Sequence, residues 1–124
     1  MRWPYGSVET APIDDRDIAA VAALALRGER LAGGDYVLTG PESLTQEAQV
    51  HAIGAALGRE IRFEELSPDQ FRQVMPSPIA DMLLAAWDAA VGRPAYVTET
   101  VAELLGRPAR TFREWAAEHT AAFR

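Results

Sequence analysis

The order of the predicted elements is the feature that most constrains the fold of this chain. Strand-like segments occur only in its first half, near residues 11–13, 36–39 and 60–65, and helical patterns alternate with them. From residue 67 onward only helical patterns follow. This order predicts an α/β fold with a small sheet of about three short strands flanked by helices and a helical C-terminal part. Since no long linker interrupts the chain, we expect a single domain over residues 1–124.

Capping residues predict where the first two helices begin. Asp14 and Asp15 offer side-chain oxygens and negative charge to the start of the first helix. The second helix has two candidate starts, because Ser43 with Gln46 forms a possible capping box and Thr45 is a rival cap. Either start places a helix over roughly residues 44–57.

The late helices are predicted in the same way. Ser67 followed by Pro68 is a typical helix start, because proline suits the first helical position. We expect Thr98 to cap a short helix that ends near residue 105. The remaining helical patterns cover residues 78–91 and 110–123.

Composition excludes several classes of function. The net charge is −6, and the basic residues are scattered, so we expect no binding to nucleic acid. No apolar run approaches the ~20 residues that span a bilayer, so no membrane partner is expected. The chain has no cysteine, and all 12 basic residues are arginine, which excludes thiolate and lysine Schiff-base chemistry. Because the N-terminus has no apolar signal segment, we expect a cytoplasmic location.

The segment at residues 35–49, DYVLTGPESLTQEAQ, raises the question of a phosphate-binding loop. A dinucleotide loop places several glycines between a strand and a helix, whereas this turn has Gly40 alone. Pro41 has no N–H to donate, and Glu42 would repel a phosphate. We therefore expect a structural turn and no cofactor site here.

Three segments resemble the C-terminal half of NmrA-like proteins, which are atypical short-chain dehydrogenases/reductases. They are APIDDRDIAAVAALAL, YVLTGPESLTQEAQVHAIGAALGREIRFEELSP and LLGRPARTFREWAAEHTAAF. In that family, an N-terminal half with a glycine-rich turn binds NAD(P), and the C-terminal half closes over the substrate. The resemblance implies that this chain corresponds to the substrate side and lacks the Rossmann half. NAD(P) is then expected only if a separate N-terminal half is supplied.

The resemblance implies a site at the N-terminus and has a competing interpretation there. It would put Trp3, Pro4 and Tyr5 beside the nicotinamide and the substrate. The alternative, which we favour, is a frayed chain end, because these residues follow the first methionine.

Other candidate residues also have two interpretations. Asp14, Arg16 and Asp17 could orient a substrate, but a helix cap with an internal ion pair explains them sufficiently. Trp87 could be a ligand platform, although its wide apolar helix face favours a core position. We expect no metal site. The two histidines, at positions 51 and 119, have no catalytic partner nearby in sequence, and His119 is expected to pack in the core.

These observations favour a stand-alone small-molecule-binding protein derived from the substrate half of an oxidoreductase, with room for a non-redox activity such as isomerisation or cyclisation. One alternative is one part of a split or truncated NAD(P)-dependent oxidoreductase. Another is a regulatory or protein-interaction module. The expected partners are a small-molecule ligand and either a second copy or a separate Rossmann-half chain. In a homodimer, we expect residues 18–26 and 36–39, or the segment 1–10, at the interface.

Overall fold

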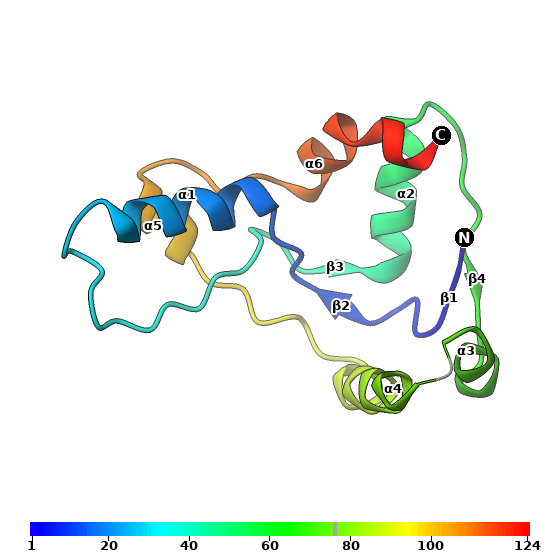
Figure 1. Ribbon diagram of the computed structural model, residues 1–124. Helices are drawn as coiled ribbons and strands as arrows, with labels where there is room; N and C mark the ends of the chain where they lie inside the picture. The colour runs from blue at the N-terminus through cyan, green and yellow to red at the C-terminus, as the bar shows by residue number, and fades with distance from the viewer. Residues whose placement is uncertain (76) are drawn as a thin grey trace.

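The computed structural model describes residues 1–75 and 77–124. Over these residues the chain is an α/β fold, as predicted, in which six α-helices surround two short strand pairs (Figure 1). In chain order the elements are β1 (Arg2–Trp3), β2 (Glu9–Thr10), α1 (Asp15–Leu26), β3 (Leu44–Thr45), α2 (Gln46–Ala56), β4 (Glu64–Glu65), α3 (Pro68–Val74), α4 (Pro78–Ala90), α5 (Thr100–Leu105), α6 (Phe112–Glu118) and a final 3₁₀ turn (Thr120–Phe123).

The strands form two separate two-stranded ladders. β1 pairs in parallel with β4, with Trp3 opposite Glu65. β2 pairs antiparallel with β3, with Thr10 opposite Leu44. The predicted strand at 60–65 is confirmed only at its end, and the strand predicted at 11–13 lies two residues earlier, at 9–10.

The predicted strand at 36–39 is wrong. Residues 36–39 are not part of a strand, and two of their hydrogen bonds join them to one threonine on the loop before α5. Thr98 donates its hydroxyl to the Val37 carbonyl at 2.9 Å, and the Thr98 amide donates to the Thr39 hydroxyl at 2.9 Å. Side-chain hydroxyls therefore take hydrogen bonds that a neighbouring strand would otherwise make.

The helix caps agree with the sequence at three starts, while two other residues expected to cap a helix do not. Asp14 caps α1, Ser67 with Gln70 forms a capping box on α3, and Thr45 caps α2 by accepting from the Ala48 amide at 3.0 Å. The rival capping box at Ser43 is wrong, because that hydroxyl instead accepts from the Ala95 amide. The expected cap at Thr98 is also wrong. Its hydroxyl donates to the Val37 carbonyl, and α5 starts without a side-chain cap.

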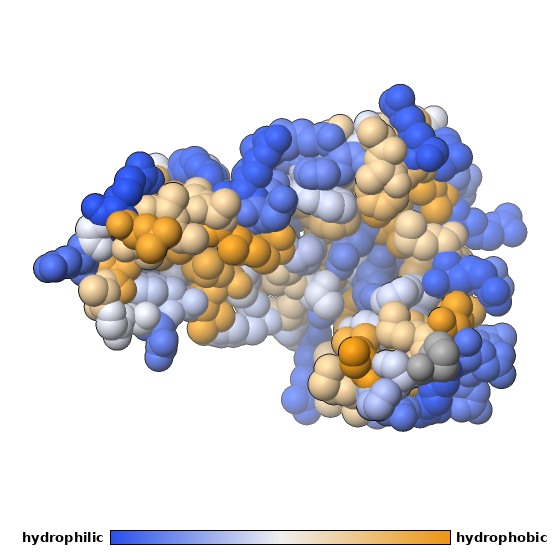
Figure 2. Space-filling view, viewed as in Figure 1, coloured by the Kyte–Doolittle hydropathy of each residue, from blue (hydrophilic) through white to orange (hydrophobic). Residues whose placement is uncertain are grey.

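The helices lie in three groups around the strand pairs. Figure 1 shows α1 beside α5 at one end, α2 beside α6, and α3 beside α4 below the N-terminal strand. The aromatic core lies in the last group, where Leu66, Phe71, Ala80 and Leu84 are buried. The other end is less covered: Leu26 on α1 is 88% exposed, and Figure 2 shows hydrophobic surface over this end of the molecule.

Candidate functional site

A cleft of about 340 Å³ lies where the N-terminal strand, α2 and α4 meet, and it is our candidate site. Two of its lining residues, Trp3 and Trp87, are candidates from the sequence. The others include Phe63, Phe112, Gln46 and Gln49. A mostly apolar cleft with a few polar groups is the usual form of a small-molecule site.

The tryptophan wall of the cleft is held in place by the core. Trp3 and Trp87 meet edge to face with their ring centroids 5.8 Å apart. Both rings also meet Phe71, which is 2% exposed, at 5.2 and 5.6 Å. Edge-to-face packing at these distances is favourable and restricts ring rotation. Trp87 therefore serves as core and as cleft wall together, so the two interpretations from the sequence are not exclusive.

One face of α2 forms the opposite wall. Gln46, Gln49, Val50 and Ile53 line the cleft and are spaced three and four residues apart, which places them on one side of the helix. Val50 and Ile53 give this face an apolar stripe, but neither glutamine was a predicted site residue. The signal was present, because two carboxamides continue the stripe by one helical turn toward the N-terminus.

The orientation of both carboxamides is fixed by their partners. Gln46 donates its Nε2 to the backbone carbonyls of Pro4 and Tyr5, at 3.4 and 3.2 Å. Gln49 donates its Nε2 to the Thr10 hydroxyl at 2.7 Å and to the Leu44 carbonyl at 3.4 Å. Because a carbonyl oxygen can only accept, the nitrogen of each glutamine must be the atom that faces it. Each Oε1 is thereby left as an acceptor.

The N-terminal segment is packed rather than frayed, which corrects the expectation from its position. Pro4 is fully buried, and the terminal amine donates to the Arg62 carbonyl at 2.6 Å. Tyr5 adopts φ 54°, a left-handed conformation that is strained for tyrosine. Its hydroxyl donates to Asp88 Oδ1 at 3.2 Å. Burial and the nearby Asp88 carboxylate raise the pKa of the Tyr5 hydroxyl above its ordinary value.

Asp14, Arg16 and Asp17 do not line this cleft. Asp17 is fully buried and accepts from Arg107 Nη2 at 2.8 Å and from the Arg110 amide at 2.7 Å. Asp14 accepts from Arg110 Nε at 2.8 Å. Burial by itself raises the pKa of Asp14, but the hydrogen bonds from Arg110 and the Arg16 amide hold it below its ordinary value. These ion pairs join α1 to the start of α6. The ion pair that was expected from the sequence, internal to the first helix, is therefore wrong.

Arg16 completes the same cluster from its exposed side. Its guanidinium lies 2.8 Å from Glu118, which also pairs with Arg110 at 2.6 Å. The acceptors and donors in this group satisfy one another, so its geometry favours a structural role over substrate orientation.

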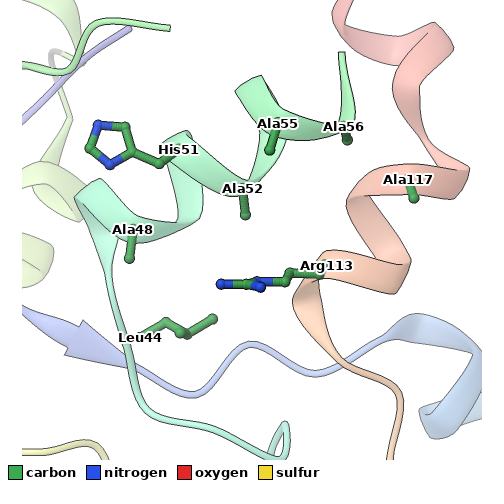
Figure 3. Close-up of a pocket in the computed structure, with 8 residues that line it drawn as sticks. All are labelled: Leu44, Ala48, His51, Ala52, Ala55, Ala56, Arg113 and Ala117. Atoms are coloured by element: carbon green, nitrogen blue, oxygen red, sulfur yellow. The ribbon is translucent and has the colours of Figure 1, made fainter. Parts of the chain in front are cut away.

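A second pocket, of about 540 Å³, lies between α2 and α6 (Figure 3). Its α2 wall consists of alanines, and Figure 3 shows the Arg113 side chain extending from α6 toward Ala48 and Leu44. His51 lies at its edge. This pocket offers one guanidinium over an apolar floor, with fewer aromatic and hydrogen-bonding groups than the cleft.

Neither histidine is hydrogen-bonded to a carboxylate in the part of the chain that the structure describes, although His119 shares a pocket with Asp14 and Asp15. His51 is exposed on α2. His119 is half-buried rather than in the core; its ring stacks on Trp115 at 4.7 Å, and its Nδ1 lies 2.8 Å from the Trp115 carbonyl. Among residues 1–75 and 77–124, no group of three or more histidine, aspartate and glutamate side chains is placed to hold a metal ion. Over the same residues no helix has the length and apolar character that a bilayer crossing requires.

Comparison with known proteins gives this geometry a context. The chain is 44% identical over 128 residues to the (4-alkanoyl-5-oxo-2,5-dihydrofuran-3-yl)methyl phosphate reductase of Streptomyces griseus, a match over 99% of this chain and 45% of the relative. It is 38% identical to the NAD(P)H azoreductase of Xenophilus azovorans, over 97% of this chain and 44% of the relative. The chain is related to part of these reductases. No protein-family model matches it.

The solved structures agree on the fold. The triphenylmethane reductase of a Citrobacter species superposes with a TM-score of 0.77 over 98% of this chain and 44% of that protein, at 16% identity. The chain therefore spans less than half the length of the proteins that it matches. The two related reductases and the shared fold support the resemblance to NAD(P)-binding reductases of the NmrA-like type, over a segment of those proteins. Its correspondence to the C-terminal half stays a prediction.

Proposed function

We propose that this chain supplies the substrate-binding part of an NAD(P)H-dependent reductase and corresponds to the C-terminal half of an NmrA-like protein. The observation that carries the proposal is the aromatic cleft in a chain related to two reductases. Its volume of about 340 Å³ lies within the range of small-ligand pockets. Its tryptophan and phenylalanine rings suit a flat, conjugated substrate.

The turn at Gly40 does not fit the phosphates of a dinucleotide. Gly40, the glycine of the turn considered from the sequence, is buried against the backbone, and a Cβ there would lie 1.8 Å from the Pro12 carbonyl oxygen. A phosphate cradle needs open amides at such a turn, whereas the Gly40 amide donates to the Ala11 carbonyl. We therefore propose that a separate segment or chain holds the cofactor.

A second candidate function is a stand-alone binding protein without a dinucleotide site, with a non-redox activity such as isomerisation or cyclisation. It is favoured by a cleft whose lining residues come from several elements of this one chain: β1, β2, α2, α4, α6 and the loop before β4. Both candidate functions predict that this chain alone does not bind the cofactor, and calorimetry with NADPH tests that prediction. We expect no dissociation constant near the micromolar range; for comparison, a Kd of ~1 mM corresponds to only about 4 kcal/mol.

Saturation-transfer NMR with 2-naphthol, a flat aromatic alcohol, tests the cleft. We expect saturable binding that is weakened at least fivefold by Phe63→Ala, because Phe63 is a wall of the cleft. Phe123→Ala is the matched control, since Phe123 packs on Trp115 and is absent from the cleft wall. Equal affinity of both variants, or no saturable binding to the wild type, would contradict the proposal.

For the partner, we propose that the exposed face of α1 meets a second copy of this chain or a separate Rossmann-half chain. Ile18 and Leu26 on α1 are 46% and 88% exposed, and Tyr36 and Val37 are 42% and 56% exposed. An apolar surface of this kind favours association. The segment 1–10 is less suited to that role, because Pro4 and Val8 are buried within the chain. This surface also supports a regulatory or protein-interaction role as a third possibility.

A further inference from the structure

The two glutamines on the cleft wall both direct the carboxamide nitrogen toward acceptors of the protein. Gln46 and Gln49 lie one helical turn apart on α2 and both line the cleft. Each carboxamide nitrogen is directed to groups of the protein: Gln46 to two backbone carbonyls, and Gln49 to one carbonyl and the Thr10 hydroxyl. This arrangement cannot be reversed without facing oxygen against oxygen.

The consequence is that the cleft presents acceptors. Among the described residues, neither glutamine Oε1 receives a hydrogen bond, and no fully buried side-chain oxygen or nitrogen lacks a partner. The two Oε1 atoms are therefore reachable by water or by a ligand. On the same wall Val50 and Ile53 supply only apolar surface, whereas the donors of the cleft, the Thr10 hydroxyl and the indole N–H groups of Trp3 and Trp87, come from other elements.

We propose that the cleft selects flat aromatic ligands that carry a hydroxyl or N–H group, and that Gln49 is a specificity-determining residue for that group. The inference rests on the proposed function of the cleft as a substrate site. Aromatic rings meet the walls of Trp3, Phe63 and Trp87, while the donor of the ligand reaches the free Oε1 of Gln49. A ligand with only acceptor oxygens would displace water from Oε1 without replacing its hydrogen bond.

Matched probes separate the donor from the ring. The probes are 2-naphthol and 2-methoxynaphthalene, which share the naphthalene ring but differ in the hydroxyl donor. Calorimetry or NMR titration of the full chain should give a Kd for 2-naphthol about fivefold to tenfold lower, which is the worth of one neutral hydrogen bond. Equal affinities for the two probes overturn this inference but leave the cleft as a site. Absence of binding by both overturns the proposed function as well.

Two variants identify the residue. Gln49→Met removes the acceptor and should abolish the preference for 2-naphthol, whereas Gln49→Glu keeps an acceptor and should retain it. Gln73→Met, at an exposed position of α3, is the matched control and should leave the preference unchanged. A preference that survives Gln49→Met in a folded protein overturns the assignment. If Gln49→Met fails to fold, the two probes on the wild type and Gln49→Glu still decide: a preference lost in Gln49→Glu also overturns it.

Discussion

The buried carboxylate of Asp17 gives the sharpest test of the physical reasoning. Its side chain is fully buried and accepts from Arg107 Nη2 at 2.8 Å and from the Arg110 amide at 2.7 Å. Asp17→Ala removes both acceptors. The Arg107 guanidinium, whose side chain is 43% exposed, can return to water at little cost, but the Arg110 amide loses its acceptor.

The magnitude follows from these contacts. A hydrogen bond to a charged group contributes about 1.5–3 kcal/mol, and a buried amide without an acceptor costs about 1–3 kcal/mol. After discounting the exposed Arg107, we expect the free energy of unfolding to fall by about 3–4 kcal/mol. This agrees with the about 3–5 kcal/mol expected when one partner of a buried pair is removed. Asp17→Asn keeps one acceptor oxygen and should fall between the wild type and Asp17→Ala.

Urea unfolding followed by circular dichroism measures the effect. Asp15→Ala is the matched control, because Asp15 lies on the same helix, in its first turn, and is exposed. Its loss should cost less than about 1 kcal/mol, the usual contribution of an exposed charge at a helix start. If the two alanine variants lose the same stability within about 0.5 kcal/mol, the buried ion pair does not hold α1 to the start of α6.

Three further outcomes are expected. Gly40→Ala should strongly destabilise the chain in the same assay, because its Cβ would meet the Pro12 carbonyl oxygen at 1.8 Å, whereas Gly28→Ala, with nothing within 4 Å, should be neutral or stabilising by up to about 1 kcal/mol; equal effects would refute the close approach. The lowered pKa of Asp14 contributes stability that is present above the unfolded value near 3.9 and is lost as pH falls through the lower folded value. The urea concentration at the unfolding midpoint should therefore decrease as the pH falls below about 4, and the decrease should be less steep for Asp14→Asn. The same pH dependence in both proteins would contradict this. Light scattering at micromolar concentration should give twice 13.5 kDa for the wild type and 13.5 kDa for Leu26→Glu, while a monomeric wild type would show that the α1 face has no second copy on it.

Local chemistry was predictable from the sequence because its partners are close in the chain. Ser67 and its Gln70 partner are three residues apart, and Asp14 caps the amide two residues later. Such contacts depend only on backbone geometry within one turn of helix. The helix starts at these positions were therefore correct.

Elements that depend on distant partners were not predictable in the same way. The segment 36–39 has strand-forming residues, but a strand also needs a backbone ladder beside it. Here Thr98, 59 residues from Thr39, supplies side-chain bonds instead. The Thr98 hydroxyl bonds to the Val37 carbonyl and therefore does not cap α5. The long-range contacts of this one residue account for both the wrong strand and the wrong cap.

The candidate site was predictable only in its aromatic part. Trp3 and Trp87 could be proposed from residue type alone, but the wall formed by Phe63 and α2 depends on how β4 brings its preceding loop beside β1. The direction of the Gln46 amide likewise depends on the carbonyls of Pro4 and Tyr5, which lie 42 and 41 residues away. Sequence periodicity gives the face of a helix and not the atom that a side chain presents.

The ion pairs between α1 and the loop before α6 can form only after most of the chain has been synthesised. Asp17 lies 90 residues before Arg107, and Asp14 lies 96 residues before Arg110. At typical elongation rates of 5–20 residues per second, about 5 to 20 seconds separate the two carboxylates from their cations on the ribosome. During that interval α1 cannot dock with its charges compensated, since an unpaired buried charge is costly. A nascent chain stalled before residue 107 should therefore keep α1 open to proteases, and emergence of residues 107–124 should close it.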